Sequence, residues 1–241
     1  MAHPLPPGHW APAVHRMLCT VLETAPAGSV AALDFDHTCI AGDISHALLR
    51  QREADTGEDL WSPYQADCAA DTETGYAKLS VTLLRGMTPD EAVAYATDGL
   101  ARAVRERSVG FSSDMAHLVA AMADRGWTIW VITASASPLV IPAAAHYGLR
   151  PQQVVGLDPE LTHGRFGERV PKPRTYREGK ATHLMRVAGR PPTLAFGDST
   201  GDAAMMALAS NAVFVDHGDA EMSRLATEHG WLTQPGWICS F

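Results

Sequence analysis

Short apolar runs typical of buried strands alternate with helical segments along most of this 241-residue chain. The strand-like runs cover residues 30–35, 127–132, 154–155, 193–196 and 212–215. Between them, helical spacing with capping residues or glycine stops is typical of helices, and a hairpin is expected around His163 and Gly164. Strands that alternate with helices form parallel sheets joined by right-handed crossovers. The sequence therefore predicts an α/β fold with a doubly wound, mainly parallel sheet.

Residues 43–108 break this alternation, because they show helical spacing without a convincing strand. The clearest helix start among them runs from Thr88 to Glu91. It combines an N-cap Thr, a Pro at the first helical position and a capping Glu. We therefore expect residues 43–108 to form an α-helical cap domain. Residues 1–42, with a helix at about 11–24, and residues 109–241 are expected to form the α/β core.

Charge and composition exclude several classes of partner. The formal net charge is −8 and no basic stripe is present, so nucleic acid is not expected to bind. No segment approaches the roughly 18 consecutive apolar residues of a membrane span. The Pro-rich start lacks the basic and then apolar order of a secretory signal. The four cysteines are far apart, which argues against a zinc site or a disulfide framework and favours the cytoplasm: Cys19, Cys39, Cys68 and Cys239.

Two carboxylates close the first strand-like run. Asp34 and Asp36 are two positions apart, so on extended chain they face the same way while Phe35 turns back toward the core. Two carboxylates this close repel each other, so one binds a proton or both share a cation. Such a costly pair at a strand end indicates a functional site.

Further polar groups follow later strands or open helices. Thr133 ends the second long strand, Lys180 opens a helix, and Asp198 and Asp202 lie in a segment that follows the strand at 193–196. In doubly wound sheets the ligand site lies at the carboxyl ends of the strands, where these groups fall. Carboxylate ligands without His or Cys suit Mg²⁺. The sequence therefore predicts a magnesium site at this edge.

These residues occur in the order of four known motifs. Asp34 to Thr38 matches DxDxT, Thr133 and Lys180 match single-residue motifs, and Gly197 to Asp202 matches GDSxxD. The chain thereby resembles the haloacid-dehalogenase superfamily of phosphohydrolases over about residues 30–215. The segment Pro138-Leu139-Val140-x-Pro142 is similar to the phosphoserine-phosphatase-like branch. That branch carries a helical cap between its first and second motifs, where residues 43–108 lie.

The resemblance implies a role for each motif residue. Asp34 would attack phosphorus to give an aspartyl-phosphate, and Asp36 would act as general acid and then general base. Mg²⁺ would bind Asp34, the backbone carbonyl of Asp36 and Asp198.

The same resemblance implies how the phosphoryl group is held. Lys180, the Thr133 hydroxyl and the backbone N–H of Ala134 would bind the phosphoryl oxygens. Asp202 would support Lys180 or a metal-bound water without being a ligand itself. Ser135 is a local alternative to Thr133, because both begin a matching Ser/Thr-Ala-Ser pattern.

Substrate-binding residues are less defined. Asp43 is either the N-cap of the next helix or, by the resemblance, the acid that meets a substrate ammonium group. Ser80 stands where phosphoserine phosphatases carry an Arg for the substrate carboxylate, although Arg85 or Lys78 could substitute. Four aromatic residues of the cap are either core or, for two or three of them, the walls of a pocket for a cationic or ring-bearing leaving group: Trp61, Tyr64, Tyr76 and Tyr95. Trp61 and Tyr64 are the first candidates.

Taken together, the residues predict a Mg²⁺-dependent phosphomonoesterase that hydrolyses a small phosphorylated metabolite, such as an amino-alcohol phosphate. One alternative is a phosphotransferase, in which an alcohol instead of water accepts the phosphoryl group. A second is a protein that binds a phosphometabolite without catalysis. The intact set of Asp34, Asp36, Lys180 and Asp198 argues against the second alternative.

Overall fold

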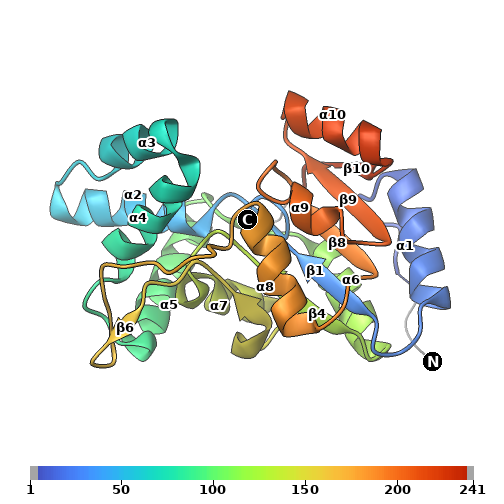
Figure 1. Ribbon diagram of the computed structural model, residues 1–241, viewed down its shortest axis with the longest axis horizontal. Coiled ribbons are helices and arrows are strands. Elements are labelled where there is room, and N and C mark those ends of the chain that lie inside the picture. The colour runs from blue at the N-terminus through green and yellow to red at the C-terminus, as the bar shows by residue number, and fades with distance from the viewer. Residues whose placement is uncertain (1–4, 238–241) are drawn as a thin grey trace.

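The five apolar runs and one further edge strand form a six-stranded sheet in the computed structural model, which describes residues 5–237 (Figure 1). The strand order is β10-β9-β8-β1-β4-β5, and every neighbouring pair is parallel. The strands are β1 (Val30–Leu33), β4 (Thr128–Ile132), β5 (Val154–Val155), β8 (Leu194–Gly197), β9 (Asn211–Asp216) and β10 (Leu232–Pro235). The predicted doubly wound sheet is confirmed.

Helices cover both faces of the sheet because side chains alternate along each strand. Leu33 of β1 belongs to the cluster that also buries residues of α1, α6 and α7, whereas Ala32 belongs to the cluster with α8, α9 and α10. These helices are α1 (Pro12–Thr24), α6 (Ser113–Asp124), α7 (Ser137–His146), α8 (Glu178–Ala188), α9 (Ala203–Met206) and α10 (Ala220–His229). Burial on both faces is typical of parallel sheets.

Four helices form the cap, which lies to one side of the sheet in Figure 1. They are α2 (Ile44–Thr56), α3 (Trp61–Ala70), α4 (Thr72–Leu84) and α5 (Pro89–Arg105). The start of α5 is the predicted capping box. Thr88 N donates to Glu91 Oε2 at 2.8 Å, and Glu91 N donates to Thr88 Oγ1 at 3.2 Å. The predicted helical cap is therefore present.

The chain passes between core and cap on a short antiparallel pair, β2 (Ile40–Ala41) and β3 (Gly110–Phe111). Gly42, at the end of this pair, has φ 87°, and a Cβ at this position would lie 2.1 Å from the Ser108 carbonyl oxygen. Only glycine combines this left-handed backbone with so close an approach. The two crossing segments are therefore held tightly side by side.

A hairpin from the core also contacts the cap. Strands β6 (Leu161–Thr162) and β7 (Arg165–Phe166) form the hairpin that the sequence predicts. Phe166 N donates to Met87 O, and Gly86 N donates to Phe166 O, both at 2.8 Å. Figure 1 shows β6 beside the cap helix α5. The cap is thus linked to the core by hydrogen bonds in addition to the two crossings.

The sequence patterns missed the short strands β2 and β3, the helix α10 and the edge strand β10. Helical spacing predicts a helix near residues 202–209, but α9 spans only Ala203–Met206. Strand β10 contains Thr, Gln and Pro, which an edge position tolerates. Cys239 lies outside the described residues, and the other three cysteines are free. Among the described helices, none has the length and apolarity to cross a membrane.

Gly42→Ala should lower the free energy of unfolding by about 3 kcal/mol or more, because the new methyl group meets a backbone oxygen on a left-handed backbone. Gly57→Ala is the matched control. Gly57 has φ 74° but no atom within 4 Å of a Cβ, so the expected loss is about 1 kcal/mol. Urea unfolding of both variants tests this difference, and equal losses would contradict it.

Candidate active site

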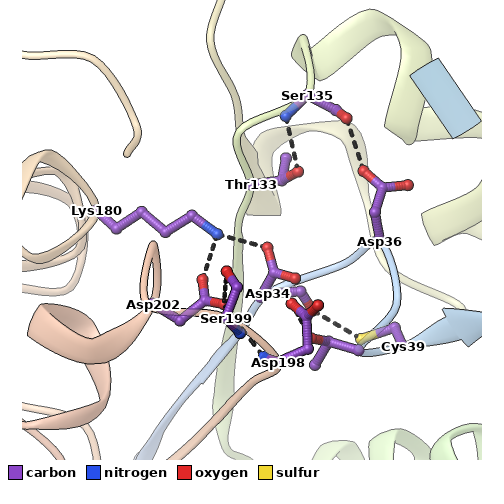
Figure 2. A network of polar contacts seen from close by, with 10 residues as sticks. Asp34, Asp36, Cys39, Thr133, Ser135, Lys180, Asp198, Ser199 and Asp202 are labelled. Carbon is purple, nitrogen blue, oxygen red and sulfur yellow. Dashed lines mark hydrogen bonds and ion pairs between the residues drawn. The ribbon is translucent and has the colours of Figure 1, made fainter. Parts of the chain in front are cut away.

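The two carboxylates that follow β1 lie in one cavity but have different partners. Asp34 Oδ1 accepts a hydrogen bond from Lys180 Nζ at 2.5 Å. Asp36 accepts from Ser135 Oγ at 2.6 Å and from the backbone N–H of Ile44, at the start of α2, at 2.8 Å. Figure 2 shows the two carboxylates pointing to separate sets of partners. One is therefore paired with a cation, and the other is held by neutral donors.

Lys180 joins two of the carboxylates. Its side chain comes from the first turn of α8, is 3% exposed, and contacts Asp34 Oδ1 and Asp202 Oδ1, both at 2.5 Å. Asp202 Oδ2 accepts the N–H groups of Asp198 and Ser199 at 3.2 and 3.1 Å, and the Ser199 hydroxyl at 3.1 Å. Asp202 therefore holds the loop after β8 and the ammonium group together.

Three carboxyl groups lie close together at this edge of the sheet. Asp34, Asp198 and Asp202 each place one carboxylate oxygen within 4.8 Å of the others. Burial, reinforced by Asp34 and Asp202, raises the pKa of Asp198 to about 10. Burial also raises the pKa of Asp34, to about 6, with Asp202 adding to it.

Lys180 pairs with Asp34 and Asp202, whereas Asp198, with its pKa of about 10, holds a proton at neutral pH unless another cation is bound. Burial alone lowers the pKa of Lys180, but Asp202 and Asp34 outweigh burial and raise it. The ammonium group therefore stays charged. Three carboxyl groups whose oxygens lie this close, one of them ionised only when a further cation is present, are hard oxygen ligands that fit a divalent cation such as Mg²⁺.

Both hydroxyl candidates of the second motif face the same cavity. Thr133 directly follows β4, and its Oγ1 accepts from Ser135 N at 3.0 Å. The Ser135 hydroxyl donates to Asp36 and accepts from Ser45 Oγ at 2.8 Å. Figure 2 shows Thr133 and Ser135 on one loop, with Ser135 above Asp36 and Thr133 beside it. The structure thus links Ser135, and not Thr133, directly to Asp36.

The cavity between these groups has a volume of about 90 Å³. It brings together most residues predicted from the sequence: Asp34, Asp36, Asp43, Thr133, Ala134, Lys180 and Asp198. Asp202 lies behind them and is fully buried. Drug-sized ligands occupy pockets of roughly 300–1,000 Å³, so this cavity suits a small group.

The cap contributes Asp43 and an aromatic residue. Asp43 caps α2 by accepting from His46 N at 2.8 Å, and it also lines the cavity. The N-cap is confirmed, and contact with a substrate ammonium group stays a prediction. Burial raises the pKa of Asp43 to about 6. The candidates Trp61 and Tyr64 do not line the cavity. Their rings pack around His46, at centroid distances of 5.2 and 5.1 Å.

Two tyrosines line the cavity instead. Tyr76 comes from α4, and Tyr176 precedes α8; their ring centroids are 6.2 Å apart. Tyr76 was one of several cap aromatics in the sequence, and helical spacing does not reveal which of them faces the core. Tyr176 was missed, although its position four residues before Lys180 is a usable signal.

The comparisons with known proteins identify a family. A sequence profile described as haloacid dehalogenase-like hydrolase matches residues 31–207. No curated protein matches the chain in sequence.

Solved structures share the fold at low sequence identity. A protein of unknown function from Anaerococcus prevotii DSM 20548 is 14% identical with a TM-score of 0.76, over 97% of this chain and 94% of that chain. A protein of unknown function from Bordetella pertussis Tohama I is 18% identical with a TM-score of 0.70, over 86% and 98%. A substrate-bound phosphoserine phosphatase is 14% identical with a TM-score of 0.59, over 86% and 92%.

Lys180→Met should lower the free energy of unfolding by about 3–5 kcal/mol at neutral pH without divalent ions, because Asp34 and Asp202 lose their cation. The loss should shrink as the pH falls, because the unpaired carboxylates then bind protons. Denaturant unfolding at several pH values measures this. Lys78→Met is the control, since Lys78 pairs with Asp67 at the surface and should cost at most about 1 kcal/mol. Equal losses would contradict the assignment.

Proposed function

Since the chain belongs to the haloacid dehalogenase-like hydrolase family, we propose that it is a Mg²⁺-dependent phosphomonoesterase acting on a small phosphorylated metabolite. One observation carries this proposal. Asp34 and Asp36 share a cavity, but Asp34 contacts an ammonium group whereas Asp36 contacts only neutral donors. Burial and the charge of Asp43 raise the pKa of Asp36 to about 7. This pair therefore combines an anionic nucleophile with a carboxyl group able to exchange a proton near neutral pH.

The chemistry assigned to the two carboxylates has two steps. A carboxylate oxygen of Asp34 forms a bond to phosphorus as the bond from phosphorus to the substrate oxygen breaks. Asp36 gives its proton to that leaving oxygen. Asp36 then takes a proton from water, whose oxygen attacks the aspartyl-phosphate, releases phosphate and restores both carboxyl groups.

The remaining residues are proposed to hold the phosphoryl group. Lys180, the Thr133 hydroxyl and the Ala134 N–H would bind its oxygens, and Asp202 would keep Lys180 in place. The role of Ser135 would be to orient Asp36.

Asp34, Asp198 and the backbone carbonyl of Asp36 would hold Mg²⁺. When bound, the ion would offset the repulsion between the carboxylate and the phosphate, which is about 4 kcal/mol for two unit charges at 4 Å and an effective dielectric of 20.

The leaving group is proposed to be an amino alcohol or a similar group without a carboxylate. Asp43 offers a buried carboxylate to the cavity, and Lys180 is the one Lys or Arg among the described lining residues. Ser80 donates to Tyr76 O and does not line the cavity. The possible substitutes, Arg85 and Lys78, pair with Glu168 and Asp67 outside it. These placements argue against recognition of a carboxylate such as that of phosphoserine.

Purified protein should release inorganic phosphate from members of a panel of phosphorylated metabolites, and amino-alcohol phosphates should be among the best. Release should stop with a chelator, return with Mg²⁺ and return poorly with Ca²⁺, whose longer and looser coordination misplaces the attack. Asp34→Asn should abolish release while the far-ultraviolet circular dichroism spectrum stays unchanged.

Retained turnover in Asp34→Asn would place the nucleophile elsewhere. Added alcohols distinguish the related phosphotransferase, because a phosphorylated alcohol would then replace free phosphate among the products. No turnover and no transfer on any ester would refute the proposed activity and favour a binding protein.

Asp36→Asn should slow turnover by roughly 10²–10⁴-fold on alkyl phosphates, because their alkoxides need a proton to leave. The loss should be much smaller on para-nitrophenyl phosphate, whose leaving group is stable as an anion. Steady-state rates on the two esters measure the difference. An equal loss on both would mean that Asp36 does not protonate the leaving group.

A further inference from the structure

Two side chains from the C-terminal part of the chain bind the turn that follows Asp36. His217 Nε2 donates to the carbonyl oxygen of His37 at 2.7 Å. Trp237 Nε1 donates to the carbonyl oxygen of Thr38 at 2.5 Å. The donors lie 180 and 199 residues away from their acceptors in the sequence. We call His217 and Trp237 the C-terminal clamp.

The turn needs support because of its backbone. His37 has φ 58°, a left-handed conformation that side chains with a Cβ disfavour. Its N–H donates to Gly42 O at 3.0 Å, which closes the turn on one side. The carbonyl groups of His37 and Thr38 are bound on the other side by the clamp.

The clamp itself rests on a rigid frame. Strand β10 pairs with β9 up to Pro235, and Gly236 N donates to Asp216 O at 3.0 Å, just before His217. The ring of Trp237 packs edge-on against Trp10, with ring centroids 5.1 Å apart and an interplanar angle of 89°. The sheet edge and the start of α1 therefore fix both donors.

The turn leads directly to the proposed metal site. Thr38 is fully buried, and its hydroxyl donates to Asp198 Oδ1 at 3.4 Å. Trp237 thus holds the backbone of a residue whose side chain contacts a proposed Mg²⁺ ligand. Asp36, whose backbone carbonyl oxygen is another proposed Mg²⁺ ligand, directly precedes His37, and His217 binds the carbonyl oxygen of His37.

We propose that His217 and Trp237 are positioning residues that hold residues 36–38 and, through Thr38, the Asp198 carboxylate, so that the site binds a divalent cation more tightly. This inference rests on the Mg²⁺ site of the proposed function. Groups that orient metal ligands from outside typically change metal affinity by roughly 10–100-fold when removed. His217 and Trp237 contact the backbone of His37 and Thr38, which are not themselves metal ligands, so a smaller effect on the Mg²⁺ affinity is expected.

Trp237→Phe keeps an aromatic ring and removes the N–H donor. Isothermal titration with Mg²⁺ should give a dissociation constant raised roughly threefold to tenfold. Trp10→Phe is the matched control. Trp10 lies in the same ring cluster, and its own Nε1 is buried without a hydrogen-bond partner. This control should leave the Mg²⁺ dissociation constant unchanged within twofold, even if it lowers the melting temperature as much as Trp237→Phe does.

The exposed His217 gives a second pair of variants that does not endanger folding. His217→Phe should weaken Mg²⁺ binding and lower kcat with little change in KM at saturating Mg²⁺. His217→Gln, whose amide N–H reaches a similar position, should restore both. If wild type binds Mg²⁺ and both Trp237→Phe and His217→Phe bind it equally well, the clamp proposal is wrong while the proposed function stands. If wild type binds no Mg²⁺, both are wrong.

Discussion

The buried contact of the Lys180 ammonium group with Asp34 and Asp202 is the interaction on which the candidate site depends. It joins three segments that are far apart in sequence: the end of β1, the first turn of α8 and the loop after β8. Taking these charges out of water is costly unless each is paired and hydrogen-bonded. The third carboxyl group, Asp198, has no ammonium partner, and burial with Asp34 and Asp202 raises its pKa to about 10, so it holds a proton that a divalent cation would replace.

Much of the fold and the position of the site were predictable because the signals are local. A strand is marked by a short apolar run, and a helix by its cap, as at Thr88 and Glu91. Parallel strands bring their carboxyl ends to one edge, so Asp34, Thr133 and Asp198 had to meet there. The catalytic, phosphate-binding and metal-binding roles of these residues stay predictions, as do the domain boundaries at residues 42 and 109 and the cytoplasmic setting.

The parts that the sequence did not reveal depend on tertiary contacts. Which cap aromatic faces the cavity is decided by how α3 and α4 pack, so the structure has Tyr76 where Trp61 and Tyr64 were the candidates. Thr133 is favoured over Ser135 in the sequence because it ends the strand directly, but the contact of Ser135 with Asp36 depends on how distant segments pack. The hydrogen bonds from His217 and Trp237 join residues 180 and 199 positions apart, and no local sequence pattern predicts them.

The hairpin that contacts Gly86 and Met87 has a mechanical consequence for access to the cavity. Its segment continues from Phe166 to Tyr176, which lines the cavity, and then into the helix that carries Lys180. A movement of the cap that kept the backbone bonds of the hairpin would therefore also displace the segment that leads to Lys180. The hairpin in this way connects the position of the cap to that of the ammonium group.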